Sequence, residues 1–252
     1  MHALAHADTG RDAATKEADP RATTLCEAFQ ATAARSPDDI ALRTGDNGAT
    51  LSWARYADQV RRLAAGLSAL GVRRGDTVGL MLTNRIEFYP CDTAALHLGA
   101  TPFSIYNTSS PEQIGYVFGN ARNRVVITES QFLERLESAR ALFGSSMHVV
   151  CVDDPEVEVM TLEQLEQLGE PGFDFEASWR AVQPEDVITL IYTSGTTGPP
   201  KGVELTHANV LAQCRAVAQV LPMRAGARIT SYLPSAHAAD RWSSHYNQMV
   251  YG

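Results

Sequence analysis

A glycine- and hydroxyl-rich stretch, VITLIYTSGTTGPPKG at residues 187–202, has the composition of an anion-binding loop. Its first part, residues 187–192, has the length and β-branched content of a buried strand. The loop that follows contains Thr193, Ser194, Gly195, Thr196, Thr197 and Gly198, and then Lys201. Glycines let backbone N–H groups approach phosphate oxygens, hydroxyls add donors, and a lysine adds a compact positive charge. The stretch therefore predicts a polyphosphate-binding loop.

Two other interpretations of this loop compete with phosphate binding. A flexible Ser/Thr/Gly linker has a similar composition, but Pro199 and Pro200 stiffen the end of the loop. A P-loop of the NTPase type needs a glycine before its lysine and a helix after it, whereas Lys201 follows a proline and residues 203–205 alternate like a strand. We therefore expect the loop to join two strands.

Residues 192–203, followed by Leu205-Thr206-His207-Ala208-Asn209, resemble the phosphate-loop signature of the AMP-forming acyl-adenylate enzymes, which include acyl-CoA synthetases, adenylation domains and luciferases. Asn84, Arg85, Glu87 and parts of residues 99–112 are similar to the amino-terminal half of long-chain fatty acid–CoA ligases. The resemblance covers roughly residues 24–252. It implies ATP-dependent activation of a fatty acid through acyl-AMP to acyl-CoA, with ATP, Mg²⁺ and coenzyme A.

The resemblance also implies roles for single residues. The phosphate-binding set would be Thr193, Ser194, Gly195, Thr196, Thr197, Gly198 and Lys201, with Thr193 also ligating Mg²⁺. A Leu-Pro-x-x-His element followed by an acid and an arginine is matched by Leu233, Pro234, His237, Asp240 and Arg241. His237 and Lys201 are the expected catalytic residues. Without the resemblance, the favoured role for His237 is to cap the next helix.

Bulk properties exclude several classes of protein. The hydrophobic content of 44% is ample for a core, and a net charge of −8 leaves no basic footprint for nucleic acid. The four cysteines are widely spaced, so they predict neither a zinc site nor a disulfide framework, and reduced thiols in the cytoplasm are the default. No window approaches the ~18 apolar residues of a spanning helix. Membrane contact, if any, would be peripheral.

Strands alternate with helices over most of the chain, which predicts an α/β fold of layered, largely parallel sheets flanked by helices. We expect residues 1–23 to form a disordered tail and residues 24–252 to form the front part of an AMP-binding domain. Ser52 and Thr206 are predicted to cap helices. Residues 228–233 are predicted to form a strand and residues 239–251 a helix, and His207 is expected to face solvent.

Members of the resembled family extend far beyond 252 residues, and the later part normally supplies the rest of the site and a carboxy-terminal domain. We therefore expect that domain to be absent here, the chain alone to form no acyl-CoA, and a second chain to be one source of the missing part. Two alternatives stay open. One is a non-catalytic relic or nucleotide-binding partner, and the other is a ligase that adenylates an aryl or amino acid.

Overall fold

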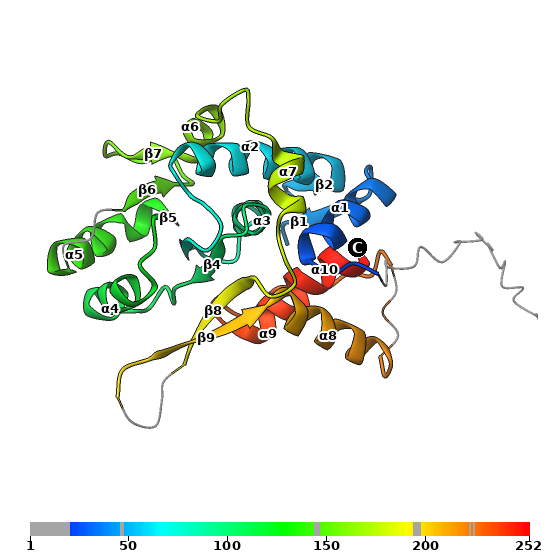
Figure 1. Ribbon diagram of the computed structural model, residues 1–252. Coiled ribbons are helices and arrows are strands. Elements are labelled where there is room, and N and C mark those ends of the chain that lie inside the picture. Colours follow the sequence, from blue (N-terminus) through cyan, green and yellow to red (C-terminus); the bar gives the residue numbers. More distant parts are fainter. Residues whose placement is uncertain (1–20, 46–47, 144–146, 194–197, 222, 224) are drawn as a thin grey trace, which may run out of the picture.

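The computed structural model describes residues 21–252 except 46–47, 144–146, 194–197, 222 and 224 (Figure 1). The elements in chain order are α1 (Leu25–Arg35), β1 (Ile40–Arg43), β2 (Thr50–Ser52), α2 (Trp53–Ala69), β3 (Thr77–Met81), α3 (Phe88–His97), β4 (Thr101–Ser104), α4 (Pro111–Ala121), β5 (Val125–Thr128), η1 (Ser130–Phe132), α5 (Leu133–Phe143), β6 (His148–Cys151), β7 (Met160–Thr161), α6 (Leu162–Gln167), α7 (Phe175–Arg180), β8 (Val187–Thr193), β9 (Lys201–Thr206), α8 (His207–Ala218), α9 (Ala238–Asp240), the π-helix η2 (Arg241–Tyr246) and α10 (Asn247–Tyr251). The alternation of helices and strands confirms the predicted α/β class.

Side-chain caps determine where the main helices begin. The Thr24 side chain accepts a hydrogen bond from the Glu27 amide, and Glu27 reaches back to the Thr24 amide, which forms a capping box. Ser52 caps α2, and Thr206 forms a capping box with Asn209 at the start of α8. Both caps were predicted, because a short hydroxyl side chain satisfies amides that the first helical turn leaves without partners.

The main sheet has five strands in the order β4-β3-β5-β6-β7, and every neighbouring pair is parallel. From β3 the chain first adds β4 on one side and then crosses over to add β5 on the other. The connections that leave β3 and β5 therefore run in opposite directions. In open α/β sheets, the carboxyl ends of two such strands border a crevice in which ligands commonly bind.

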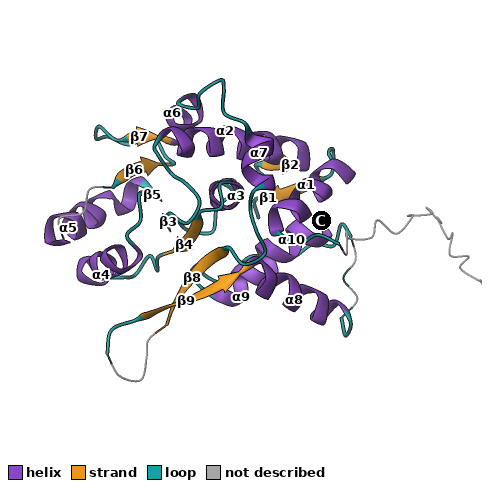
Figure 2. Cartoon of the chain, viewed as in Figure 1, coloured by secondary structure: helices purple, strands orange, loops and turns teal. Residues whose placement is uncertain are grey.

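Helices cover both faces of this sheet (Figure 2). Val78 and Leu80 of β3 face a large core cluster that also contains residues of α1, α2 and α3. Met81 and Val126 face the opposite way, into a cluster with residues of α4 and α5. This alternation is what a strand buried on both sides requires.

A second, two-stranded sheet consists of β8 and β9, which form an antiparallel hairpin (Figure 1). It packs beside β4, the edge strand of the main sheet, where the Thr101 hydroxyl donates a hydrogen bond of 2.8 Å to the Val187 carbonyl. The prediction that the glycine-rich loop joins two strands is confirmed. The order of elements thus brings the loop to the edge of the main sheet.

For the carboxy-terminal part, the predicted strand is wrong and the predicted helix is confirmed. Residues 228–233 do not form a strand, and Ile229 and Tyr232 are 50% and 79% exposed, because this segment pairs with no strand among the described residues. The helix predicted for residues 239–251 is present as the continuous run of α9, η2 and α10, and the difference from the prediction is that its middle part is a π-helix. π-Helical segments such as these six residues are rare and are frequently found at functional sites.

Candidate active site

The β8–β9 hairpin places the two described ends of the predicted phosphate loop opposite each other. Thr193, the last residue of β8, pairs with Lys201, the first residue of β9, and both side chains are exposed. Gly198 has a φ of 94°, a left-handed conformation that glycine adopts without strain. The predicted residues Ser194, Gly195, Thr196 and Thr197 lie outside the described residues. A residue with a hydroxyl group and a residue with an ammonium group are therefore cross-strand partners at the base of the loop.

Helix α4 holds both strands of the hairpin next to the loop. The Tyr116 hydroxyl donates a hydrogen bond of 3.0 Å to the Pro200 carbonyl, and the Tyr192 hydroxyl donates one of 2.8 Å to Asn120 Oδ1. Burial, with a smaller contribution from Tyr116, raises the pKa of Tyr192 to about 12, so it remains a donor at neutral pH. The sequence predicted α4 but gave no signal that its Tyr116 and Asn120 support the loop.

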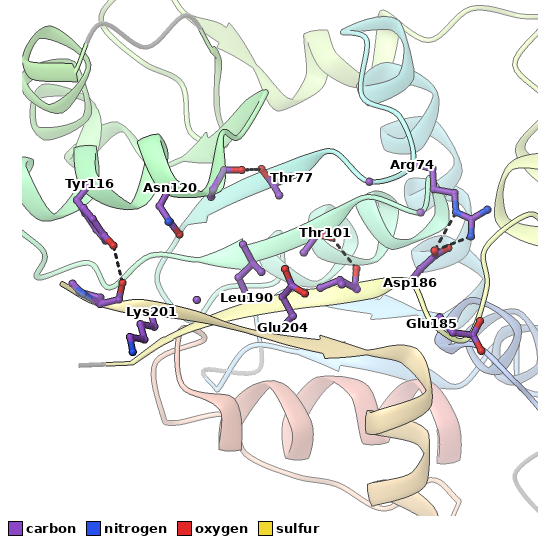
Figure 3. Close-up of a pocket in the computed structure, with 16 residues that line it drawn as sticks. Arg74, Thr77, Thr101, Tyr116, Asn120, Glu185, Asp186, Leu190, Lys201 and Glu204 are labelled. Atoms are coloured by element: carbon purple, nitrogen blue, oxygen red, sulfur yellow. Dashed lines mark hydrogen bonds and ion pairs between the residues drawn. The ribbon is translucent and has the colours of Figure 1, made fainter. Parts of the chain in front are cut away.

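An open cavity of about 890 Å³ lies between the hairpin and the part of the main sheet and α4 that faces it (Figure 3). Tyr116, Asn120 and Lys201 lie at one end of it, and Arg74 lies at the other, where its guanidinium is 2.8 Å from the Asp186 carboxylate. The Arg74 charge is thus already paired. Lys201 has no ion-pair partner among the described residues, so its charge is available to an anionic ligand.

His237 lies on a separate segment, between Leu233 and the π-helix. Its side chain is exposed, and its Nδ1 accepts a hydrogen bond of 3.2 Å from the Ala239 amide at the start of α9. No hydrogen bond joins His237 to the described part of the hairpin. The structure thus shows the capping role, and the catalytic role stays a prediction.

A buried polar network follows His237 in the π-helix. Arg241, which is 1% exposed, donates to Asp92 Oδ2 of α3 at 2.5 Å and to the Tyr246 hydroxyl at 2.7 Å. His245 Nε2 lies 2.9 Å from Asp92 Oδ1. Burial alone would lower the pKa of Arg241, but the nearby Asp92 charge raises it above its ordinary value. The i to i+5 spacing of a π-turn places Arg241 beside Tyr246.

The sequence did not predict the partners in this network. The one signal was Asp92 itself, an acid within the largely apolar helix α3. Arg241 and Asp92 are 149 residues apart, so no local pattern could pair them. A buried charge needs an opposite charge nearby, which the structure supplies.

His207 is buried, contrary to the prediction that it faces solvent. It is 1% exposed, and its Nδ1 accepts a hydrogen bond of 3.0 Å from the Leu25 amide at the start of α1. Burial lowers the pKa of His207 to about 3, so the ring is neutral at physiological pH. The error arose because the first residue of a helix commonly faces water, whereas α8 packs this end against α1.

A protein-family model described as AMP-binding enzyme matches residues 29–251. The chain belongs to the AMP-binding enzyme family. Relatives include the Uncharacterized protein Rv1549 of Mycobacterium tuberculosis, 58% identical over 133 residues, which are 53% of this chain and 74% of that protein. The Long-chain-fatty-acid–CoA ligase ACSBG2 of Xenopus laevis is 29% identical over 244 residues, covering 91% of this chain and 33% of that ligase.

Solved structures give the same fold. The N-terminal domain of FACL13 from Mycobacterium tuberculosis, bound to an inhibitor, matches with a TM-score of 0.73 and 24% identity over 90% of this chain and 55% of that one. The chain thus has the fold of the N-terminal domain of adenylate-forming enzymes, as predicted. It spans about a third of the Xenopus ligase.

The described residues contain neither a candidate membrane span nor a candidate metal-binding cluster. Within these residues no helix combines the length and apolar character that a membrane crossing needs. In the same part of the chain, no group of three or more His, Cys, Asp or Glu side chains has the arrangement of a metal site. Cys26, Cys91, Cys151 and Cys214 are buried free thiols.

Proposed function

We propose that this chain carries the phosphate-binding part of an AMP-forming fatty acid–CoA ligase. The observation that carries the proposal is the pairing of Thr193 with Lys201 at the base of the loop, in a chain that matches the AMP-binding family over residues 29–251. The names of the relatives favour a fatty acid over an aryl or amino acid substrate, because the Xenopus relative is a long-chain fatty-acid–CoA ligase.

In the proposed reaction, a fatty-acid carboxylate attacks the α-phosphorus of ATP and pyrophosphate leaves. Lys201 donates to the β- and γ-phosphates and neutralises the charge that develops on the leaving group. Coenzyme A then displaces AMP and forms the thioester. His237 orients the junction between the carboxylate and the α-phosphate.

The residues present suit a magnesium–nucleotide complex. The Thr193 hydroxyl is an oxygen ligand of the kind that Mg²⁺ prefers, and Thr193 is the cross-strand partner of Lys201. Among the described residues, nothing outside the adjacent chain packs against Gly198 on the side where another residue would carry a side chain, so this position is open to a ligand. Mg²⁺, when bound, would neutralise phosphate charge. Its other ligands would be phosphate oxygens and water.

The ligase relatives are longer than the part that matches this chain, and the rest of the proposed site would lie in that additional sequence. We propose that this part is supplied either by the continuation of the same chain or by a second chain. The protein would work in the cytoplasm, with at most peripheral contact with a membrane when it takes up the fatty acid.

ATP–pyrophosphate exchange tests this function. The 252-residue chain and the same chain joined to the remaining part of a related ligase should be assayed with fatty, aryl and amino acids. We expect exchange in the joined form, fastest with fatty acids, and no acyl-CoA from the 252-residue chain alone. A joined form that folds, binds ATP and exchanges with none of the acids would contradict the ligase proposal and favour the non-catalytic relic.

A further inference from the structure

The segment that carries His237 is a closed loop. The Ser231 hydroxyl donates to both oxygens of the Asp240 carboxylate at 3.1 Å, which joins two residues nine positions apart. Asp240 is 4% exposed and also accepts a hydrogen bond of 2.9 Å from the Ser244 hydroxyl. The two ends of the loop are therefore fixed to each other, with His237 exposed between them.

The second end of this loop is anchored in the core. Arg241 follows Asp240 directly and is held by Asp92 at 2.5 Å and by the Ser104 hydroxyl at 3.1 Å. These partners belong to α3 and to the end of β4. A buried, hydrogen-bonded ion pair of this kind fixes one geometry, because any displacement leaves a charge without its partner.

The first end of the loop is held by Asn84, which follows β3. The Asn84 Nδ2 donates to the Leu233 carbonyl at 2.8 Å and to the Ser231 hydroxyl at 3.1 Å. The Asn84 amide thus binds the backbone carbonyl immediately before Pro234. Asn84 is itself exposed, so it adds little to the core.

Asn84 stands at the crevice between the carboxyl ends of β3 and β5. Its neighbour Arg85 is fixed there by Glu87 and Asp153, each at 2.8 Å, and lies 3.5 Å from Glu129. The Thr83 amide donates to the same Glu129 carboxylate. Both chain neighbours of Asn84 are therefore held by hydrogen bonds or ion pairs, which favours a fixed position for a residue that sets the position of another.

We propose that Asn84 is a positioning residue, which fixes the loop of residues 231–240 on the main sheet and thereby sets the location of His237. The inference rests on the proposed role of His237 at the junction of carboxylate and phosphate. Asn84 itself need not contact the reactants. Asn84 acts through the Leu233 carbonyl and Ser231.

Hydrogen–deuterium exchange of the 252-residue chain tests the anchoring without any assay of activity. Asn84→Ala and Asn84→Asp both remove the donor, and Asn84→Gln keeps it. Gln59→Ala is the matched control, because the Gln59 amide also donates across elements, to Glu166 at 2.9 Å. We expect exchange in residues 231–240 to become roughly tenfold faster in the first two variants, with less change in Asn84→Gln and none in the control.

The same variants in the joined ligase test the catalytic consequence. Asn84→Ala should lower kcat for pyrophosphate exchange about tenfold and leave KM for ATP nearly unchanged, with partial recovery in Asn84→Gln. Unchanged exchange of residues 231–240 in Asn84→Ala would overturn the anchoring. A faster-exchanging loop with unchanged kcat would overturn the positioning role. If His237→Ala is also without effect on kcat, the proposed function of His237 fails while the anchoring stands.

Discussion

The two candidate parts of the site are held in opposite ways. The hairpin presents Thr193 and Lys201 as exposed side chains next to an open cavity, and Tyr116 and Tyr192 hold its strands through single hydroxyl groups. The His237 loop instead ends in a fully buried ion pair. A side chain that orients a reacting carboxylate needs a fixed frame, whereas a lysine that binds phosphate needs to be accessible to its ligand. We therefore expect substitutions in the buried ion pair to lower stability strongly and substitutions in the exposed hairpin to affect ligand binding more than stability.

The largest effect on stability is expected in the buried network. Arg241→Met leaves the Asp92 carboxylate without its charged partner inside the core, so the free energy of unfolding should fall by about 3–5 kcal/mol. Urea unfolding followed by circular dichroism measures it. The control is Arg180→Ala, which breaks an exposed pair with Glu176 and should cost less than about 1 kcal/mol. Similar losses in both variants would show that the Asp92 pair is not a special anchor.

A second prediction concerns two buried histidines, His97 and His207. Burial lowers the pKa of His207 to about 3 and that of His97 to about 4, both from an ordinary value of 6.5. The unfolded chain therefore binds more protons than the folded chain between about pH 6.5 and pH 4. The free energy of unfolding should therefore be unaffected by these two histidines above about pH 6.5. Below that pH it should fall by about 1.4 kcal/mol per pH unit for each histidine as the solution is acidified.

Chemical denaturation at several pH values measures this slope. His207→Gln should reduce the slope by roughly half, whereas His148→Gln, at an exposed position, should leave it as in the wild type. A His207→Gln variant with the full slope would mean that His207 is protonated in the folded protein.

Much of this fold was predictable because the signals are local. The apolar run before Thr193 and the alternation after Lys201 predicted both strands of the hairpin, and the hydroxyls of Ser52 and Thr206 predicted helix starts. The site was less predictable because its supports act at a distance. Asn84 and Leu233 are 149 residues apart. The strand predicted at residues 228–233 failed for a related reason, since alternation in sequence does not supply a partner strand.

Loss of a hydrogen bond between α4 and the hairpin should reduce stability less than loss of the buried ion pair. Tyr116→Phe removes the hydrogen bond to the Pro200 carbonyl, and because that residue is only partly buried, water can replace the lost donor. The free energy of unfolding should fall by about 0.5–1 kcal/mol. Amide exchange should become faster in residues 201–206 and stay unchanged in the loop of residues 231–240. Tyr106→Phe, a surface tyrosine, is the control. Faster exchange in both regions would mean that the two parts are mechanically coupled.

The smallest effect on stability is expected at Lys201 itself. Its side chain is exposed, so Lys201→Ala should change the free energy of unfolding by less than about 0.5 kcal/mol. Thermal unfolding monitored by calorimetry measures this difference. A loss of 2 kcal/mol or more would assign Lys201 a structural role and weaken the phosphate proposal.

The affinity of the chain for Mg–ATP and for AMP, measured by isothermal titration calorimetry, tests the central claim most directly. AMP lacks the β- and γ-phosphates, so a lysine that binds them contributes to the affinity for ATP alone. Lys201→Ala should therefore lower the affinity for ATP at least about tenfold and leave the affinity for AMP unchanged. Arg140→Ala, at a position on α5 that does not line the cavity, should alter neither affinity. Equal ATP affinity in Lys201→Ala and the wild type, or an equal loss for ATP and AMP, would contradict the account.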